Sequence, residues 1–462
     1  MHTSEMIWEE AKSVPVIEDV DICVLGGSCT GVFAAVRAAR LGARVVIVEK
    51  QNNFGGVATS GLVNIWHSFY DTEFKQQIIG GLTQETVERL DRRGAVAEEK
   101  KSHSVGYVLN TEELKIELDE LITESGVRPY LHTMFVAPVL TDGKLTAILV
   151  ENKSGRGAIK AKMFIDATGD GDLCARLTLP LTTADHRQPP TTCAKIGGWG
   201  SGPGFNDVTG FNSLKGLNLN DALLAHQAEF DLPEGFGWGR FVPGSTDVYM
   251  YAGTRVYDAD CKDGLSLTRS EMEGRRQVRA IMDMVRKYGP DNKLTLLSLP
   301  SYIGIRETRH IHCQYRLTGD DVLHGVRFED AIANGSYRVD IHHDDKPGIT
   351  FQYLDGEQAY VRPGYPVEKG RWREKTEHDP TFYQIPYRCL VPGGYDNLLT
   401  CGRMIDVDGV AYGAVRVMVN MNQTGEAAGV AAYLALRADI GVGDVNTEEL
   451  RSTLREGGSI IL

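Results

Sequence analysis

Residues 20–49 read VDICVLGGSCTGVFAAVRAARLGARVVIVE. Two short apolar runs rich in branched side chains, 20–25 and 44–49, flank a glycine cluster and an alanine-rich stretch, 31–41. Apolar runs of this length predict strands, and the stretch between them predicts a helix. Strand, glycine turn, helix and strand within about 30 residues form a βαβ unit with parallel strands. The sequence therefore predicts an α/β fold.

The glycine cluster has the form G-x-S-x-x-G, which is a dinucleotide-binding fingerprint with serine at its middle glycine position. Gly26 suits a tight turn, Ser28 faces a pyrophosphate, and Gly31 lets the helix pack on the strand. Glu49 closes the second strand, where a carboxylate can accept ribose hydroxyls. A glycine turn in an unliganded α/β domain is the alternative interpretation.

Later segments extend this pattern. Runs at 133–140, 145–151 and 158–167 predict a three-stranded antiparallel meander, because Asp142-Gly143 between apolar runs is a hairpin signal. An amphipathic helix capped by Thr111 is expected over 111–126.

The segment 182–380 differs in composition, with many Gly, Pro, Trp and Tyr residues and helical patterns only at 217–230 and 268–288. It is expected to be an inserted α+β unit. A strand at 397–401 and a long apolar helix at 415–437 follow.

Composition excludes several classes of protein. The chain has 49 Lys and Arg against 62 Asp and Glu, so its formal charge of −13 disfavours nucleic acid and anionic lipid surfaces as partners. The longest apolar stretch, 427–436, is too short to span a membrane, and residues 1–19 lack a signal-peptide pattern. We therefore expect a cytoplasmic protein. Eight cysteines without a C-x-x-C pair give little support to a metal or iron–sulfur site.

Three further motifs follow the first fingerprint in order. Residues 55–61 read GGVATSG, residues 166–172 read DATGDGD, and CGRMID at 401–406 leads into GAVRV at 413–417. With these motifs the sequence resembles the FAD-dependent oxidoreductases of the glutathione-reductase-like superfamily. More narrowly, it resembles a family that also contains heterodisulfide-reductase-like flavoproteins, and the match covers nearly the whole chain.

The resemblance implies a Rossmann-like FAD-binding domain that carries the meander, with an inserted α+β substrate or cap domain. The predicted boundaries are 15–185 and 381–445 for the FAD-binding domain, 186–380 for the inserted domain, and 446–462 for a C-terminal helix and tail.

Carried over residue by residue, the resemblance also implies an FAD site. A helix starting near Gly413 would direct its N-terminal amides at the flavin's pyrimidine edge, where negative charge develops on reduction. The implied cofactor residues are Gly26, Gly27, Ser28 and Gly31 at the pyrophosphate; Glu49, with Lys50 beside it, at the adenosine ribose; Gly56, Ala58 and Thr59 at the flavin's linker and ring; Val136 at the adenine; Thr168, Gly169 and Asp170 near the phosphates and ribitol; Arg403 and Asp406 at the ribitol or pyrophosphate; and Gly413 and Val415 at the start of the last helix.

The sequence departs from the family pattern at two positions. Ser28 replaces a glycine, and Asn422 or its neighbourhood stands where the family usually has a cysteine. A second G-x-G-x-x-G after a strand is absent, so a dedicated NAD(P)H domain is not predicted.

Oxidation of a C–H donor by a flavin needs a proton acceptor and cations for substrate oxygens. RETRHIH at 306–312, YRVDIHH at 337–343 and IPYR at 385–388 resemble family segments that supply both. A histidine that titrates near neutral pH suits the base. The candidate catalytic residues are His342 as base, His310 as its reserve, Arg306 and Arg309 as cations, and Tyr387 as a hydrogen-bond donor.

Structural roles compete with these assignments. Arg306 and Arg309 would then bridge the insert to the flavin domain, and His342 would be a satisfied core or surface histidine. Covalent attachment of FAD to His67, shortly after the 55–61 loop, is a further alternative.

The best interpretation is an FAD-dependent oxidoreductase that transfers a hydride between a small organic substrate and bound FAD, with no metal. An electron-transfer subunit of an iron–sulfur or heterodisulfide-reductase-like complex, and a non-catalytic FAD-binding module, are the alternatives. The substrate, the electron acceptor and homo-oligomerisation stay open.

Overall fold

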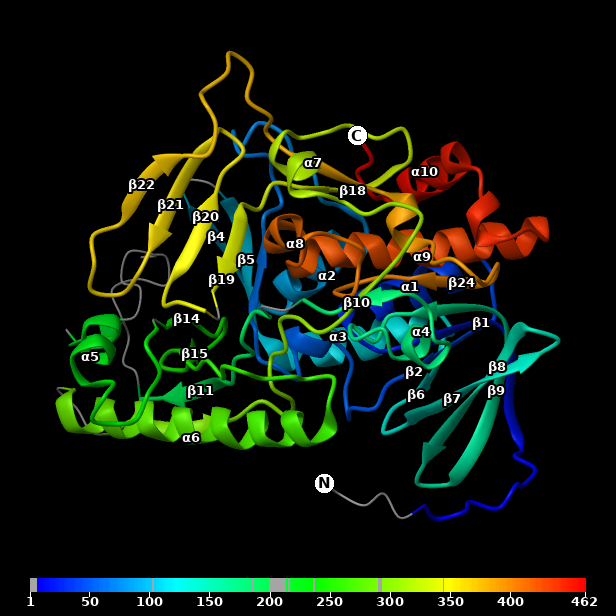
Figure 1. The fold of residues 1–462 in the computed structure, drawn as a ribbon, viewed down its shortest axis with the longest axis horizontal. Coiled ribbons are helices and arrows are strands. Elements are labelled where there is room, and N and C mark those ends of the chain that lie inside the picture. Colours follow the sequence, from blue (N-terminus) through cyan, green and yellow to red (C-terminus); the bar gives the residue numbers. More distant parts are fainter. Residues whose placement is uncertain are drawn as a thin grey trace.

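The computed structural model describes residues 6–101, 104–184, 187–198, 213–214, 217–235, 237–289, 293–343 and 345–462. Its central element is a seven-stranded sheet (Figure 1). The strands of this sheet are β1 (Val16–Leu25), β2 (Val45–Val48), β6 (Arg128–Tyr130), β7 (Met134–Thr141), β8 (Lys144–Asn152), β9 (Gly155–Asp166) and β24 (Leu398–Thr400). Their order is β6-β2-β1-β9-β8-β7, and β24 pairs with β9.

The predicted βαβ unit is confirmed. β1 and β2 are parallel, with Ile22 opposite Val45, and the helix α1 (Cys29–Arg40) connects them. All four residues of β2 are buried, as expected for a parallel sheet covered on both faces. The α/β class and its Rossmann-like core therefore hold.

The antiparallel meander is also confirmed, and it grows out of the core sheet. The first half of β9 pairs antiparallel with β8, while its second half pairs parallel with β24. Asp142 and Gly143 join β7 to β8 with φ values of 50° and 78°, which a primed hairpin turn requires. One strand thus belongs both to the meander and to the sheet that carries the fingerprint.

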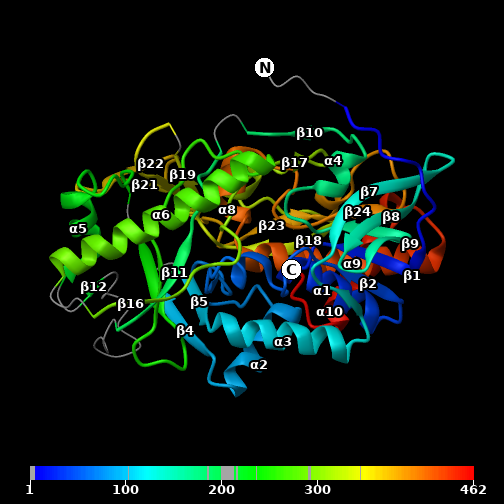
Figure 2. The same ribbon diagram turned by 90° about the horizontal axis from the view of Figure 1, so that it is seen from below.

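Helices cover the sheet and the insert (Figures 1 and 2). α1 packs mainly against the helix predicted at 415–437. The remaining helices are α2 (Gly81–Arg92), α3 (Thr111–Glu124), α4 (Asp172–Arg176), α5 (Leu219–His226), α6 (Gly264–Tyr288), α7 (Gly319–Leu323), α8 (Gly409–Val415), α9 (Met418–Ala438) and α10 (Thr447–Glu456), with short 3₁₀ turns at Gly56–Ala58, Tyr387–Leu390 and Val442–Asp444.

Two helix predictions need correction. The N-cap of α3 is Asn110, whose side chain accepts the N–H of Glu112, so Thr111 is the first helical residue. The helix predicted over 415–437 is interrupted at Arg416 and Val417, where Val417 is extended with φ −64° and ψ 143°, and α8 and α9 lie on either side.

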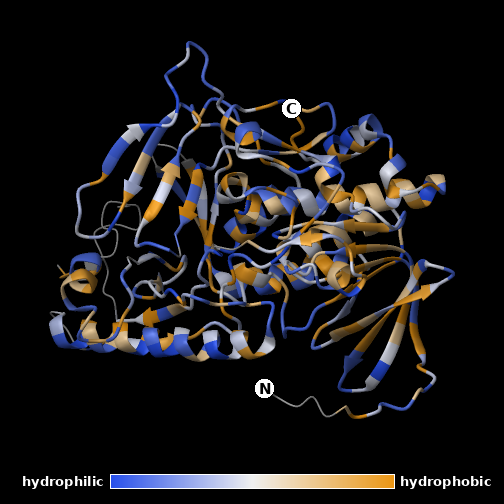
Figure 3. Cartoon of the chain, in the orientation of Figure 1, coloured by the Kyte–Doolittle hydropathy of each residue, from blue (hydrophilic) through white to orange (hydrophobic). Residues whose placement is uncertain are grey.

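The segment 182–380 is a mixed α+β region. A four-stranded sheet packs against the long helix α6, which lies below it in Figure 1, and a second four-stranded sheet, β19 to β22, lies at the upper left of Figure 1. α6 buries Val278, Ile281, Met282, Met284 and Val285, whereas Leu265 and Met272 are exposed, and Figure 3 shows hydrophilic and hydrophobic residues mixed along this helix. The remaining strands are β3 (Ile65–His67), β4 (Val96–Lys101), β5 (Ser104–Leu109), β10 (Leu181–Thr182), β11 (Cys193–Gly197), β12 (Ser213–Leu214), β13 (Leu217–Asn218), β14 (Trp238–Phe241), β15 (Tyr249–Ala252), β16 (Thr295–Ser298), β17 (His310–Ile311), β18 (Ala331–Gly335), β19 (Val339–His342), β20 (Ile349–Gln352), β21 (Glu357–Val361), β22 (Glu368–Arg371) and β23 (Tyr383–Pro386).

The predicted domain boundaries at 185, 380 and 445 stay a prediction. Within the described residues, no helix combines the length and apolar character that crossing a membrane requires.

Candidate functional site

The glycine turn lies at the N-terminus of α1, where the ends of β1 and β9 meet. Gly26 has φ +105°, and a Cβ on it would lie 2.4 Å from the carbonyl oxygen of Ala167. A Cβ on Gly31 would lie 1.9 Å from the Gly26 oxygen, so helix and turn touch directly. Ser28 is the N-cap, and its Oγ accepts the Gly31 N–H at 3.4 Å. The predicted roles of the glycines agree with this packing, whereas the capping role of Ser28 was not predicted.

Glu49 lies beside this turn, as predicted. Its buried carboxylate accepts the Gly27 N–H at 2.6 Å and the Gln51 N–H at 2.8 Å. The carboxylate and the amides at the helix N-terminus thus form one polar edge. This is the arrangement that a dinucleotide's ribose and pyrophosphate require.

The 55–61 loop packs on the glycine turn. The Gly55 N–H donates to the Gly27 carbonyl at 2.8 Å, and a Cβ on Gly56 would lie 2.9 Å from the Cβ of Ser28. Ala58 is buried, and the Thr59 hydroxyl donates to the Phe54 carbonyl at 2.6 Å. The loop is therefore held against the fingerprint by its own backbone.

The DATGDGD turn brings a buried ion pair to the same edge. Asp170 contacts Arg403 at 2.6 Å and accepts the hydroxyl proton of Thr308 at 2.9 Å. Burial raises the pKa of Asp170, but the charges of Arg403 and Lys50 outweigh it and leave this pKa lowered. Asp170 is thus an anion held between two cations.

Other residues of this turn serve to shape it. Asp166 accepts the hydroxyl and N–H of Thr168 and the N–H groups of Leu173 and Cys174. Gly169 has φ +75°, and a Cβ there would lie 3.2 Å from the Arg403 guanidinium. Asp166, the first residue of the turn, therefore stabilises the turn by accepting these hydrogen bonds.

Lys50 reaches the same region from the end of β2. Its Nζ lies 3.4 Å from the Tyr302 hydroxyl and 5.0 Å from the centre of that ring. Burial lowers the pKa of Lys50, but Tyr302, Asp170 and Asp172 raise it above its ordinary value overall. The lysine therefore stays charged beside Asp170.

Residues 306–309, which follow β16, connect the polar edge around Asp170 to a second group of charges around His342. Thr308 and Arg309 turn to Asp170, with the Arg309 guanidinium 2.9 Å from the Asp170 carbonyl and 3.1 Å from Asp172. Arg306, two residues before Thr308, instead donates to Thr191 Oγ1 at 2.6 Å and to the Pro189 carbonyl. Within this one segment, Thr308 and Arg309 thus contact the predicted cofactor site, and Arg306 contacts residues of the insert.

The second group of charges surrounds His342, at the end of β19. We call it the His342 cluster, and it consists of His342, Asp340, Arg255, Arg306, Arg338 and Arg416. Nε2 of His342 lies 3.2 Å from Oδ1 of Asp340, and Arg416 lies 3.6 Å from Oδ2. The Tyr337 hydroxyl donates to the same carboxylate at 2.9 Å. The histidine is thus anchored by a buried aspartate.

The electrostatics of His342 differ from expectation. Burial is the main cause that lowers its pKa, to about 3, and the charges of Arg306 and Arg255 add to it, while Asp340 opposes them. The expected titration near neutral pH is therefore wrong, because the imidazole is buried among cations. The His342 ring is neutral at pH 7.

Several predicted residues occupy structural positions instead. Tyr387 is 2% exposed and its hydroxyl donates to the Val442 carbonyl at 2.8 Å, so it belongs to the core. Both ring nitrogens of His310 are engaged, with the Ile405 carbonyl at 2.9 Å and with Glu307 at 3.1 Å. Neither residue has a group left to offer a substrate.

The remaining cofactor predictions are placed as follows. Asp406 is buried and accepts the Cys313 N–H at 2.8 Å, so it holds a neighbouring loop. Val136 is half-buried in β7, at an irregularity in its pairing with β8. His67 stacks against Tyr337, with ring centroids 4.5 Å apart.

The predicted helix start near Gly413 is wrong. α8 begins at Gly409 with Asp408 as N-cap, so Gly413 lies inside the helix and Val415 ends it. A Cβ on Gly413 would lie 3.0 Å from the backbone nitrogen of Asp340. The glycine therefore lets α8 approach β19, rather than starting a helix at a ligand.

Buried polar atoms without partners among the described residues mark a further feature. Among them are the side-chain amides of Asn64 and Asn422 and Nε1 of Trp66. β3, which contains Trp66, contacts α9, which contains Asn422. An unsatisfied buried polar group costs about 1–3 kcal/mol, so these atoms fit a ligand with donors and acceptors along one edge. A flavin ring has such an edge, and sequence reasoning missed Asn64 and Trp66.

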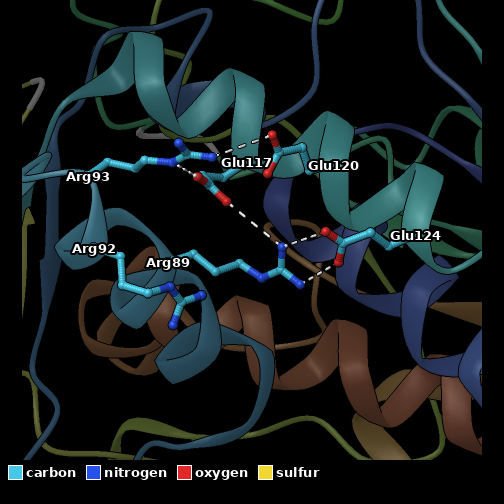
Figure 4. A pocket seen from close by; sticks show the side chains of 6 residues that line it. All are labelled: Arg89, Arg92, Arg93, Glu117, Glu120 and Glu124. Atoms are coloured by element: carbon cyan, nitrogen blue, oxygen red, sulfur yellow. Dashed lines mark hydrogen bonds and ion pairs between the residues drawn. The ribbon is translucent and has the colours of Figure 1, made fainter.

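A surface depression lies elsewhere, between α2 and α3 (Figure 4). It encloses about 370 Å³ and is lined by Arg89, Arg92, Arg93, Glu117, Glu120 and Glu124, which we call the α2–α3 cluster. Arg89 contacts Glu124 at 2.5 Å, and Arg93 contacts Glu117 at 3.3 Å. Arg89 and Arg93 pair with these glutamates across two helices, and none of the predicted site residues lines the depression.

Comparison with known proteins gives a consistent family. The family described as FAD dependent oxidoreductase matches residues 21–454. Over 164 residues the chain is 25% and 24% identical to the digeranylgeranylglycerophospholipid reductases of Thermoplasma volcanium and Thermoplasma acidophilum. Each match covers 33% of this chain and 40% of the relative, so the similarity spans less than half of these curated relatives.

Solved structures align over more of the chain. A geranylgeranyl bacteriochlorophyll reductase-like protein from Thermoplasma acidophilum is 12% identical, with a TM-score of 0.48 over 95% of this chain and 84% of that one. A flavin-dependent brominase variant is 10% identical, with a TM-score of 0.46 over the same shares.

Proposed function

The chain belongs to the FAD-dependent oxidoreductase family, and on this premise we propose that it transfers a hydride between bound FAD and a small organic substrate held at the His342 cluster. The observation that carries the proposal is the segment at residues 306–309. Its alternate residues contact Asp170 on one side and the insert on the other. Such a segment can hold a substrate at a set distance from a cofactor.

The cofactor residues of this proposal follow from the polar edge around the glycine turn. The α1 N-terminus would bind the pyrophosphate, and Glu49 would accept the ribose hydroxyls. The predicted role of the Gly27 amide at the pyrophosphate is not kept, because this N–H donates to Glu49 at 2.6 Å. Arg403 would hold the ribitol or pyrophosphate from its position on Asp170. Bound FAD supplies two-electron hydride chemistry, which amino-acid side chains lack. Asn64 and Asn422 would satisfy the polar edge of the ring.

The proton is handled by His342. Asp340 orients the ring through Nε2, and Nδ1 is buried with no partner among the described residues. Because the ring is neutral at pH 7, Nδ1 can accept a proton from a substrate hydroxyl as the hydride leaves. The surrounding arginines would hold negative charge on the substrate's oxygens.

A closer relation to the glutathione-reductase-like superfamily and to heterodisulfide-reductase-like flavoproteins is part of this proposal, supported by the four ordered motifs. An electron-transfer subunit and a non-catalytic FAD-binding module are the competing assignments. The His342 cluster favours catalysis over both, because neither function needs a buried histidine with a vacant ring nitrogen.

The proposed partners are a small-molecule substrate and an acceptor that removes two electrons per turnover. A net charge of −13 disfavours nucleic acid and anionic membranes. Each of the eight cysteines is a free thiol in the described structure, which suits the reducing cytoplasm.

The test begins with the purified full-length protein. We expect it to carry FAD, visible as flavin absorbance, and Glu49→Ala to weaken FAD retention by roughly 10- to 100-fold, because a charge-assisted hydrogen bond is lost. Anaerobic mixing with a panel of hydroxy acids, alcohols and amines should bleach the flavin with at least one substrate, and an artificial acceptor should sustain turnover. Protein that takes up no FAD would refute the proposal, and bound FAD that no substrate reduces would favour the non-catalytic module.

A further inference from the structure

The His342 cluster has an excess of buried positive charge. The charges of Arg306, Arg338 and Arg416 all act on the single carboxylate of Asp340, and the Arg416 guanidinium lies 3.6 Å from it. The side chain of Arg416 is 15% exposed and that of Asp340 is 11% exposed, so neither charge is well solvated. Buried charges are normally paired, because transfer out of water is costly for an isolated ion.

Neighbouring groups do not offset this excess. The carboxylate of Glu307 is engaged by the Gln188 N–H at 3.1 Å and by His310 at 3.1 Å, and no ion pair between Glu307 and an arginine is found among the described residues. Arg338 lies over the ring of Phe351 at 4.3 Å, which stabilises a cation but adds no negative charge. The cluster therefore needs an anion that the described residues do not supply.

The pKa of Arg306 reflects the same excess. Burial lowers it, and the charges of Arg416 and Arg255 lower it further, to about 9. An arginine normally stays protonated far above this value. A bound anion beside Arg306 would favour its charged form again.

Unpartnered polar atoms lie in the same cluster. Nδ1 of His342 and the Nε groups of Arg416 and Arg338 are buried without a hydrogen-bond partner among the described residues. Two of these atoms are N–H donors with fixed geometry, and the third is the ring nitrogen left vacant by the contact with Asp340. The set therefore suits a ligand that accepts from arginine and presents a polar group to the histidine.

We propose that the His342 cluster binds a small organic carboxylate, which pairs with Arg416 and Arg306 and presents its reacting hydroxyl or amine to Nδ1 of His342. This assignment rests on the proposed function, since it names the substrate class of the same site. Arg306 lies two residues from Thr308, which contacts Asp170, so the carboxylate would be held next to the cofactor edge. Arginine is suited to this task because its planar fork matches a carboxylate.

The proposal is tested by calorimetric titration of the FAD-loaded full chain with malonate, succinate and lactate. Malonamide, succinamide and lactamide serve as neutral counterparts of the same shape. We expect saturable binding of at least one acid and at least 10-fold weaker binding of its amide. Arg416→Gln should weaken binding of that acid by roughly 10- to 100-fold, the usual effect of losing a charge-assisted hydrogen bond. Arg306→Gln is the second variant, should Arg416→Gln fail to fold.

Arg93→Gln in the α2–α3 cluster is the matched control, because it removes the same charge from paired surroundings. Its acid affinity should equal that of the unmodified protein. Binding of no acid to protein that retains FAD, equal binding of acids and amides, or unchanged affinity in the folded arginine variants would overturn the proposal. Loss of FAD from the unmodified protein would instead count against the proposed function, and flavin absorbance distinguishes the two failures.

Discussion

The α2–α3 cluster and the His342 cluster both gather arginines and carboxylates, but they differ in charge balance. The α2–α3 cluster has equal numbers of each (Figure 4), and its side chains range from 3% exposed at Glu117 to 56% exposed at Arg93. In the His342 cluster arginines outnumber carboxylates, and the side chains of His342 and Asp340 are 10% and 11% exposed.

This difference separates a structural role from a chemical one. The glutamates of the α2–α3 cluster offset the charges of Arg89 and Arg93 and join two helices, so this cluster attracts no ligand strongly. The excess of positive charge over Asp340 in the buried cluster is costly unless a ligand offsets it. The depression between α2 and α3 is therefore not the proposed substrate site, which is the cluster whose charges do not balance.

Removing the base from the buried cluster should have the largest effect. His342→Ala is expected to retain FAD and slow flavin reduction by about 10²–10⁴-fold, the usual range for losing a general base. Stopped-flow absorbance with a reducing substrate measures the rate. His312→Ala is the control, because His312 is exposed and contacts Thr182. Reduction as fast as in the unmodified protein would remove His342 from the mechanism.

Removing the aspartate tests the charge balance directly. Asp340→Asn should lower the free energy of unfolding by about 3–5 kcal/mol, because arginines would stay buried without their carboxylate. Urea unfolding followed by fluorescence measures the change. A carboxylic acid that binds the His342 cluster should restore part of the lost free energy of unfolding, while the corresponding neutral amide should not. A loss below about 1 kcal/mol would mean that the arginines are already solvated or paired.

The next largest effect is expected in the pH dependence of the free energy of unfolding, to which His342 should contribute. Its folded pKa of about 3 lies below the ordinary value of 6.5, so between these values the unfolded chain binds the extra proton. The free energy of unfolding should therefore fall as pH falls from about 6.5, by up to about 1.4 kcal/mol per pH unit from this residue. His342→Gln should show a shallower slope between pH 4.5 and 6, above the range in which Asp340 titrates. Equal slopes would contradict the assignment.

The smallest effect is expected at the surface. Arg93→Gln should change the free energy of unfolding by less than about 1 kcal/mol, and 1 M salt should reduce the difference further, because exposed pairs are screened. Chemical unfolding at two salt concentrations measures both quantities. A salt-independent loss above about 2 kcal/mol would show that the α2–α3 cluster behaves like the buried one.

Local patterns allowed much of the fold to be predicted. The βαβ unit at 20–49 and the Asp142-Gly143 hairpin depend on strand periodicity and on backbone conformations that glycine and aspartate adopt easily. The interruption at Arg416 and Val417 was missed, because neither residue is a helix breaker and the surrounding residues are good helix formers. It occurs where α8 approaches β19, which is a tertiary contact.

The sequence by itself determined the glycine turn, the carboxylate at Glu49 and the family to which these motifs belong, because each depends on residues close in the chain or on ordered motifs. Only the tertiary structure decided which charged residues meet. Arg306, Asp340 and Arg416 come from three separate segments, and burial among them lowers the pKa of His342 from the value expected of a free imidazole. It likewise decided that the Tyr387 hydroxyl reaches the Val442 carbonyl and not a substrate. Partners so distant in sequence are chosen by packing, which no local pattern encodes.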